Sequence, residues 1–149
     1  MRYLLDASAL VPLLGELGER LIAKATEERL STTDLALYEA GNSLWKLSAL
    51  VKLITLEDAA EAIDVLKGLA ARGIIRVVGF EELDLASTLR LACGEGVTFY
   101  DASYIAAAEN VGATLVTEDR KLREAASRRV NTIAYTDFKR KVARVGPSR

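Results

Sequence analysis

The stretch from Val97 to Arg123, VTFYDASYIAAAENVGATLVTEDRKLR, carries two acidic residues at the junctions of expected secondary structure. Thr98 can cap an alanine-rich helix whose first turn contains Asp101. After that helix, the apolar run Ala113–Val116 predicts a short strand, and Asp119 follows the strand at the start of a further helix. A buried strand between two helices indicates an α/β fold.

The rest of the chain repeats this alternation. Strands are expected at Arg2–Leu5, Leu30–Thr33, Ile74–Val78, Ala113–Val116 and Thr132–Tyr135. Helices are expected at Ala9–Leu14, Glu19–Glu28, Asp34–Ile54, Thr55–Ala71, Glu82–Cys93, between Thr98 and Gly112, at Arg120–Arg128 and at Asp137–Arg144. This order predicts a mostly parallel sheet of four to five strands with helices on both faces.

Length and composition fit a single domain over residues 1–149, with half of the residues hydrophobic and only two prolines. No apolar run approaches the roughly 20 residues that span a bilayer, so we expect a cytoplasmic protein with no membrane partner. The single cysteine, Cys93, lies among apolar residues, and we expect a buried, inert thiol.

The sequence contains no histidine, and one cysteine cannot replace it as a zinc ligand. An imidazole general base is excluded for the same reason. Chemistry in this chain must therefore use carboxylates, hydroxyls, lysines or a hard metal ion held by oxygen atoms.

Four acidic residues stand out, and each has a simpler explanation when taken alone. Asp6, Asp101 and Asp119 are well placed to cap helices, and Glu39 could be a solvated residue within an apolar helix. The expected fold brings strand ends and helix faces to one edge, where four carboxylates would repel one another unless a cation neutralised them. Oxygen ligands without histidine or cysteine select Mg²⁺ or Mn²⁺, and such sites typically serve phosphoryl transfer or phosphodiester hydrolysis.

Four segments carry a resemblance that covers nearly the whole chain: LLDASAL (4–10), DLALYEAGNSLWK (34–46), GVTFYDASYIAAAE (96–109) and ATLVTEDRKL (113–122). In this order and spacing they resemble the PIN-domain ribonucleases, most closely the VapC-type toxins of toxin-antitoxin pairs. The resemblance implies a PIN-like three-layer fold and a metal-dependent endoribonuclease that cleaves single-stranded RNA. The acidic quartet of the family then falls on Asp6, Glu39, Asp101 and Asp119.

Further site residues follow from the same resemblance. Ser8 and Thr117 match the small hydroxyl positions that support the acids or bind water, and Asn42 is similar to the polar residue that follows the helix acid. Glu118 departs from the pattern, because it stands beside Asp119. Strand alternation favours Asp119 pointing into the site with Thr117, and Glu118 pointing outward.

Charge is uneven along the chain, although the net charge is −1. The basic residues concentrate after Asp119, and five of them are candidates for contact with RNA phosphates: Arg120, Lys121, Lys139, Arg140 and Lys141. A solvated basic face explains the same pattern equally well.

The resemblance also implies two protein partners. One is a second copy of the chain, because small members of the family are usually homodimers, and a broad apolar surface around Leu44, Trp45 and Leu50 agrees with that. The alternative is that these residues belong to the core. The other partner is a small antitoxin whose peptide occupies the active groove.

Other functions fit these residues less well. A haloacid-dehalogenase-like phosphotransferase needs a second aspartate two residues after the first, where this chain has Ser8. A receiver domain needs an early acidic pair and a late lysine, and neither is evident. A catalytically inactive PIN-fold module that only binds RNA or protein is the main alternative, and the presence of all four acids argues against it.

Overall fold

A computed structural model of the chain describes residues 1–17 and 27–144. Its strands are β1 (Arg2–Leu5), β2 (Arg29–Thr33), β3 (Ile75–Val78), β4 (Thr114–Val116) and β5 (Thr132–Ile133). Its α-helices are α1 (Ala7–Leu17), α3 (Asp34–Trp45), α4 (Leu56–Ala71), α5 (Leu85–Glu95), α6 (Phe99–Val111), α7 (Arg120–Ala126) and α8 (Tyr135–Arg144). A π-helical turn, η1 (Lys46–Leu50), extends α3, and a 3₁₀ turn, η2 (Phe80–Glu82), follows β3. Most of the helix expected at Glu19–Glu28 lies outside the described residues.

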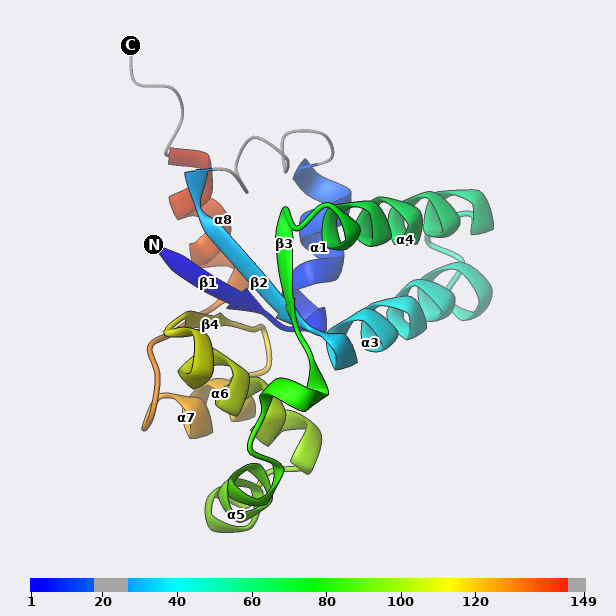
Figure 1. The fold of residues 1–149 in the computed structure, drawn as a ribbon. Helices are drawn as coiled ribbons and strands as arrows, with labels where there is room; N and C mark the ends of the chain where they lie inside the picture. The colour runs from blue at the N-terminus through cyan, green and yellow to red at the C-terminus, as the bar shows by residue number, and fades with distance from the viewer. Residues whose placement is uncertain (18–26, 145–149) are drawn as a thin grey trace.

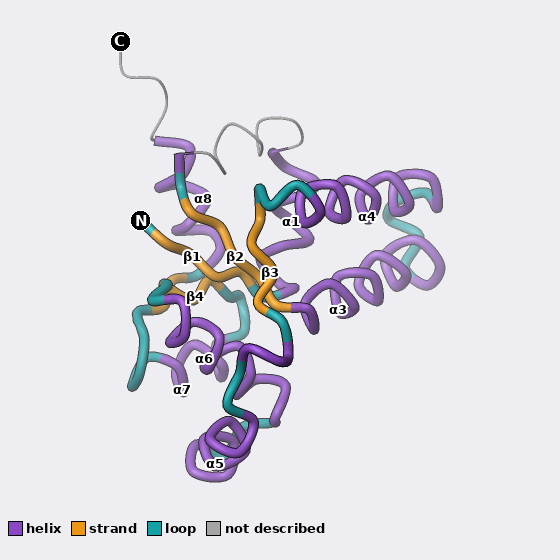
Figure 2. The backbone as a smooth tube through the Cα atoms, viewed as in Figure 1, coloured by secondary structure: helices purple, strands orange, loops and turns teal. Residues whose placement is uncertain are grey.

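All five strands are parallel, in the order β3-β2-β1-β4-β5. Helices α1 and α4 lie on one side of this sheet, and α5, α6 and α7 lie on the other (Figure 1). Figure 2 shows the strands as a central layer between these helices. The expected α/β fold class, with a parallel sheet covered on both faces, is confirmed.

The strand order places a topological switch point between β1 and β4. The chain builds outward from β1 through β2 to β3, then returns to add β4 and β5 on the other side of β1. The central strands are fully buried at Leu4, Leu5 and Leu115, as parallel strands covered on both faces must be. In such sheets ligands bind beyond the carboxyl ends of the strands at the switch point, where Asp6 and Thr117 lie.

Three of the expected helix starts were wrong by two or three residues, and the first of these helices, α1, begins at Ala7 and not at Ala9. The helix expected from Glu82 begins at Leu85, because the carboxylate of Asp84 accepts a hydrogen bond from the Ser87 amide at 3.0 Å and caps it. The last helix begins at Tyr135 and not at Asp137, so the final strand is only two residues long.

Cys93 is exposed, so the expectation of a buried thiol was wrong. Its neighbours Leu91 and Ala92 occupy the buried side of α5, and the next residue along the helix turns toward solvent. Apolar neighbours in sequence therefore did not indicate burial at this position.

The apolar surface expected around Leu44, Trp45 and Leu50 is split. Leu44 is buried within the chain, whereas Trp45 and Leu50 are about half exposed or more. They lie on α3 and η1, which project with α4 beyond the sheet (Figure 1). None of the helices in the described ranges is both long enough and apolar enough to cross a bilayer.

Candidate functional site

Asp6 occupies the carboxyl end of β1 and is only 5% exposed. One oxygen of its carboxylate, Oδ1, accepts hydrogen bonds from the Ser8 hydroxyl at 2.6 Å and from the Ala9 amide at 3.1 Å. Its other oxygen, Oδ2, accepts a hydrogen bond from the hydroxyl of Thr117. The carboxylate thus caps α1 and is bound to the end of the neighbouring strand β4.

Thr117 and Ser8 join the ends of β1 and β4. The hydroxyl of Thr117 lies 3.3 Å from that of Ser8 and accepts a hydrogen bond from the Asp119 amide at 3.0 Å. The amide of Glu118 donates to the Ser8 hydroxyl at 2.9 Å. Ser8 and Thr117, which are 109 positions apart in sequence, therefore hold the backbone just beyond β4 through hydrogen bonds.

Asp101 and Asp119 lie at two helix starts. Thr98 caps α6 by accepting a hydrogen bond from the Asp101 amide at 3.1 Å, so Asp101 stands in the first turn with no side-chain hydrogen bond to a described residue. Asp119 caps α7 by accepting a hydrogen bond from the Leu122 amide at 3.1 Å. Asp119 is therefore both the cap of α7 and a candidate metal ligand.

Glu39 is held by a residue that the sequence did not suggest. The hydroxyl of Tyr104, a buried side chain on α6, donates a hydrogen bond to the carboxylate of Glu39 on α3. Burial, and then this hydrogen bond, raise the pKa of Tyr104, so the hydroxyl stays protonated and can only donate toward the carboxylate. The available sequence signal was a lone tyrosine, three residues after Asp101, among small helical side chains.

Electrostatic coupling links the four acids. Burial raises the pKa of Asp6 despite the hydrogen bonds of Ser8, Thr117 and Ala9, and the charge of Glu39 raises it further. Burial also raises the pKa of Asp101, as do the nearby charges of Asp119 and Glu39. Lys121 opposes this shift, so its ammonium group lies within electrostatic reach of Asp101. The chain therefore gathers negative charge here beyond what its own donors compensate.

This excess charge suits a hard divalent cation. The four side chains offer only carboxylate oxygens, the donors that Mg²⁺ and Mn²⁺ prefer. In residues 1–17 and 27–144, however, no three acidic side chains lie close enough together to share one ion in this conformation. Glu39 is directed to Tyr104, and Asp119 is directed to the start of α7. Their donor chemistry fits the ion, and the side chains must approach one another to bind it.

The structure separates Glu118 from Asp119. The carboxylate of Glu118 accepts a hydrogen bond from the Thr136 amide at 3.2 Å, at the start of α8. Asn42 is exposed one turn beyond Glu39, and its side chain contacts none of the four acids by a hydrogen bond. Its supporting role stays a prediction.

The five basic candidates fall in different places. Arg120 and Lys121 begin α7 beside Asp119, whereas Lys139 forms an ion pair with Glu16 at 2.7 Å. Arg140 pairs with Asp137 at 2.8 Å. Arg140 and Lys141 line a pocket together with Met1 and Thr114, at the amino ends of β1 and β4. The structure therefore brings only Arg120 and Lys121 to the acidic edge.

Comparisons with known proteins agree with this geometry. The family model described as "PIN domain" matches residues 3–128. Two proteins of Pyrobaculum aerophilum are similar: Exonuclease VapC9 is 38% identical over 82% of this chain and 84% of its own, and Ribonuclease VapC3 is 37% identical over 83% and 94%.

Solved structures share the fold. The crystal structure of PAE2754 from Pyrobaculum aerophilum has a TM-score of 0.72 and 34% identity, covering 97% of this chain and 99% of the other. A VapBC-1 structure from nontypeable Haemophilus influenzae has a TM-score of 0.58 at 17% identity, covering 91% and 99%, and supports the fold alone. The sheet, the acids at its carboxyl edge and these matches together show that the chain belongs to the PIN-domain family.

Proposed function

We propose that this protein is a metal-dependent endoribonuclease that cleaves single-stranded RNA, and that it is the toxin of a toxin-antitoxin pair. The observation that carries the proposal is the placement of the acids: Asp6 ends β1, Asp119 follows the adjacent strand β4, and Thr117 donates to the Asp6 carboxylate while accepting from the Asp119 amide. The charges of Glu39 and Asp119 also raise the pKa of Asp101, which agrees with a shared site. The names of the two similar proteins, a VapC ribonuclease and a VapC exonuclease, support nuclease activity of this class.

Each acid has a part in the proposed site. Asp6, Glu39 and Asp101 would hold one Mg²⁺ or Mn²⁺, and Asp119 would complete its coordination or help to hold a second ion. When bound, the cation supplies a Lewis acid that lowers the pKa of water and stabilises charge on the phosphate. Ser8 and Thr117 keep the Asp6 carboxylate in one orientation. Because the chain has no histidine, the carboxylates of the site would be the side chains that accept a proton.

Exposed aromatic side chains beside the acids favour a single-stranded substrate. Tyr38, next to Glu39, is 82% exposed, and Tyr100, next to Asp101, is 62% exposed. Exposed rings offer stacking surfaces, and unpaired bases stack on them with little dependence on sequence. The adjoining cations Arg120 and Lys121 are placed to contact the phosphates.

The partners follow from the relatives. VapBC complexes share this fold, and we extend a small antitoxin partner, a homodimer through the exposed Trp45 and Leu50, and a cytoplasmic location to this chain as part of the proposal. An inactive PIN-fold binding module would need none of the four acids, and their joint presence therefore disfavours it.

Cleavage of labelled RNA tests the central proposal. With Mn²⁺ or Mg²⁺, a single-stranded RNA labelled at its 5′ end should yield internal fragments early in the reaction, and chelation by EDTA should abolish them. A ladder shortened one nucleotide at a time would instead indicate an exonuclease. Equal activity with and without the chelator would refute metal dependence, and a duplex of the same sequence serves as the control substrate.

Replacing Tyr104 with phenylalanine should weaken metal binding by about 10-fold to 100-fold, because Glu39 loses the donor that orients it. Calorimetric titration of the variant with Mn²⁺ measures this affinity directly, without reference to cleavage. Tyr135→Phe is the matched control, since the Tyr135 hydroxyl also donates to a carboxylate, that of Glu16 at 2.8 Å. Identical Mn²⁺ affinity in the Tyr104 variant and the wild type would show that Tyr104 does not position Glu39.

A further inference from the structure

A second polar pocket lies at the other end of the central strands from the acids. Its volume is about 480 Å³, and it is lined by Arg2, Arg29, Leu30, Ser31, Gly73, Ile74, Arg76, Asn110 and Val111. Three of these residues are arginines, and none is acidic. This volume falls within the usual range of small-molecule sites.

The register of the sheet places the three arginines on one face. Arg2 of β1 is paired with Arg29 of β2, and Ser31 of β2 is paired with Arg76 of β3. Residues two apart on a strand share a face, so the three guanidinium groups and the Ser31 hydroxyl project from the same side of the sheet. Like charges directly opposite each other on neighbouring strands are destabilising, and the pair Arg2 and Arg29 is such a case.

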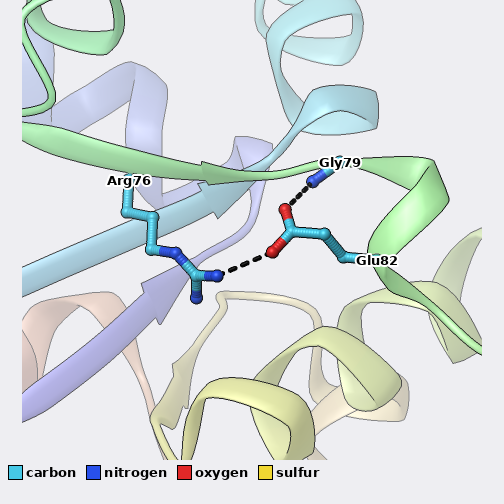
Figure 3. Close-up of polar contacts among 3 residues, drawn as sticks. All are labelled: Arg76, Gly79 and Glu82. Carbon is cyan, nitrogen blue, oxygen red and sulfur yellow. Dashed lines mark hydrogen bonds and ion pairs between the residues drawn. The ribbon is translucent and has the colours of Figure 1, made fainter.

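Internal partners account for only part of this charge. Arg2 donates to the carbonyl of Val111 at 3.2 Å, at the end of α6. Arg76 pairs with Glu82 at 2.6 Å, and the Glu82 carboxylate is also bound by the Gly79 amide at 2.8 Å (Figure 3). These contacts explain two of the three arginines as structural.

Arg29 and Ser31 have no such explanation. Neither side chain makes a hydrogen bond or ion pair in the part of the chain that the structure describes. Ser31 is only 7% exposed as a residue, and it lines the pocket. The exposed guanidinium of Arg29 and the hydroxyl of Ser31 therefore offer hydrogen-bond donors to the same pocket, and no acceptor within the described chain occupies them.

We infer that this pocket binds a phosphate group. Guanidinium groups bind phosphate oxygens through paired hydrogen bonds. Among the described residues only Arg76 of the three arginines has an acidic partner, so the pocket keeps a net positive charge that suits an anion. Arg29 and Ser31 supply the free donors, and Arg2 and Arg76 add positive charge. Since the pocket opens at the amino ends of β1 and β2, it is separate from the acids at their carboxyl ends. The phosphate belongs to a small phosphorylated ligand or to a remote segment of RNA.

Binding measured without divalent cations tests this site independently of any cleavage. The probes are inorganic pyrophosphate, a nucleoside triphosphate and a single-stranded RNA oligonucleotide, each titrated calorimetrically in EDTA. Arg29→Ala should weaken binding of at least one probe 10-fold or more, and Ser31→Ala should weaken the same probe by a smaller factor. Because both side chains lack partners in the fold, neither change should lower the thermal stability.

The control is Arg90→Ala, which removes the same charge from an exposed position on α5. If Arg29→Ala weakens the binding of RNA alone, the phosphate is part of a nucleic acid. If it weakens the binding of pyrophosphate and the triphosphate alone, the ligand is a small molecule. Both results support the site. Equal losses in Arg29→Ala and Arg90→Ala would reduce the effect to overall charge and overturn the inference. So would unchanged binding of all three probes, or binding of a hexaglutamate peptide as tight as that of pyrophosphate.

Discussion

Replacing Asp101 with asparagine should lower the rate of metal-dependent RNA cleavage by about 100-fold to 1,000-fold or more. The carboxylate stands in the first turn of α6 and makes no side-chain hydrogen bond within the described chain, so its loss leaves the fold intact. The variant loses a negative charge that lies within electrostatic reach of Glu39 and Asp119. Single-turnover cleavage at saturating Mn²⁺ measures the change.

The same substitution should raise the thermal stability of the metal-free protein by a few degrees at pH 7. Burial and the charges of Asp119 and Glu39 raise the pKa of Asp101 in the folded chain above its unfolded value. A carboxyl of this kind loses stabilising free energy as pH rises from the unfolded pKa, about 4, through the folded one. The wild type and the variant should therefore differ most near neutral pH and converge at about pH 4.

The cleavage rate and the melting temperature of Asp101→Asn together distinguish a structural role of Asp101 from a catalytic one. Loss of cleavage together with a lower melting temperature would mean that Asp101 is structural. Full cleavage by the variant would remove Asp101 from the active site altogether. Glu95→Gln is the control for removal of a carboxylate charge, because Glu95 pairs with Arg128 and does not belong to the acidic quartet.

Replacing Thr117 with valine should lower the free energy of unfolding by about 2–3 kcal/mol, although valine has nearly the same shape. Thr117 is fully buried, and its hydroxyl donates to the Asp6 carboxylate while accepting from the Asp119 amide. The variant would leave a buried charged oxygen short of a donor and a backbone amide short of an acceptor. Urea denaturation in the absence of metal measures the loss.

Thr32→Val is the matched control for this prediction. Thr32 is also fully buried, but its hydroxyl donates to the uncharged carbonyl of Leu5 at 2.7 Å. Its loss should cost about 1 kcal/mol. Equal effects of the two variants would mean that the charge of Asp6 adds nothing to the contact with Thr117. In an Asp6→Asn background, the cost of Thr117→Val should shrink, since the charged acceptor is gone.

The sequence was sufficient for the fold and for the edge at which the acids gather. Strand and helix patterns predicted the alternation, and Asp6 and Asp119 were placed correctly at strand ends because a strand followed by a polar cap is a local pattern. Tyr104 was missed because its partner, Glu39, lies 65 residues away and no local pattern indicates the contact. The pocket around Arg29 was missed for the same reason, since only the pairing of β1, β2 and β3 brings its arginines together.

The pairing of β1 with β4 has a consequence for the order in which activity appears during synthesis. A nascent chain that ends before Thr114 already contains Asp6, Glu39 and Asp101, yet it lacks the strand whose end supplies Thr117 to Asp6. Contacts across so long a stretch of sequence form late, because closing a long loop must precede them. The acidic edge therefore assembles only after most of the domain has left the ribosome, and under the proposed function the growing chain should not cleave RNA before β4 has formed.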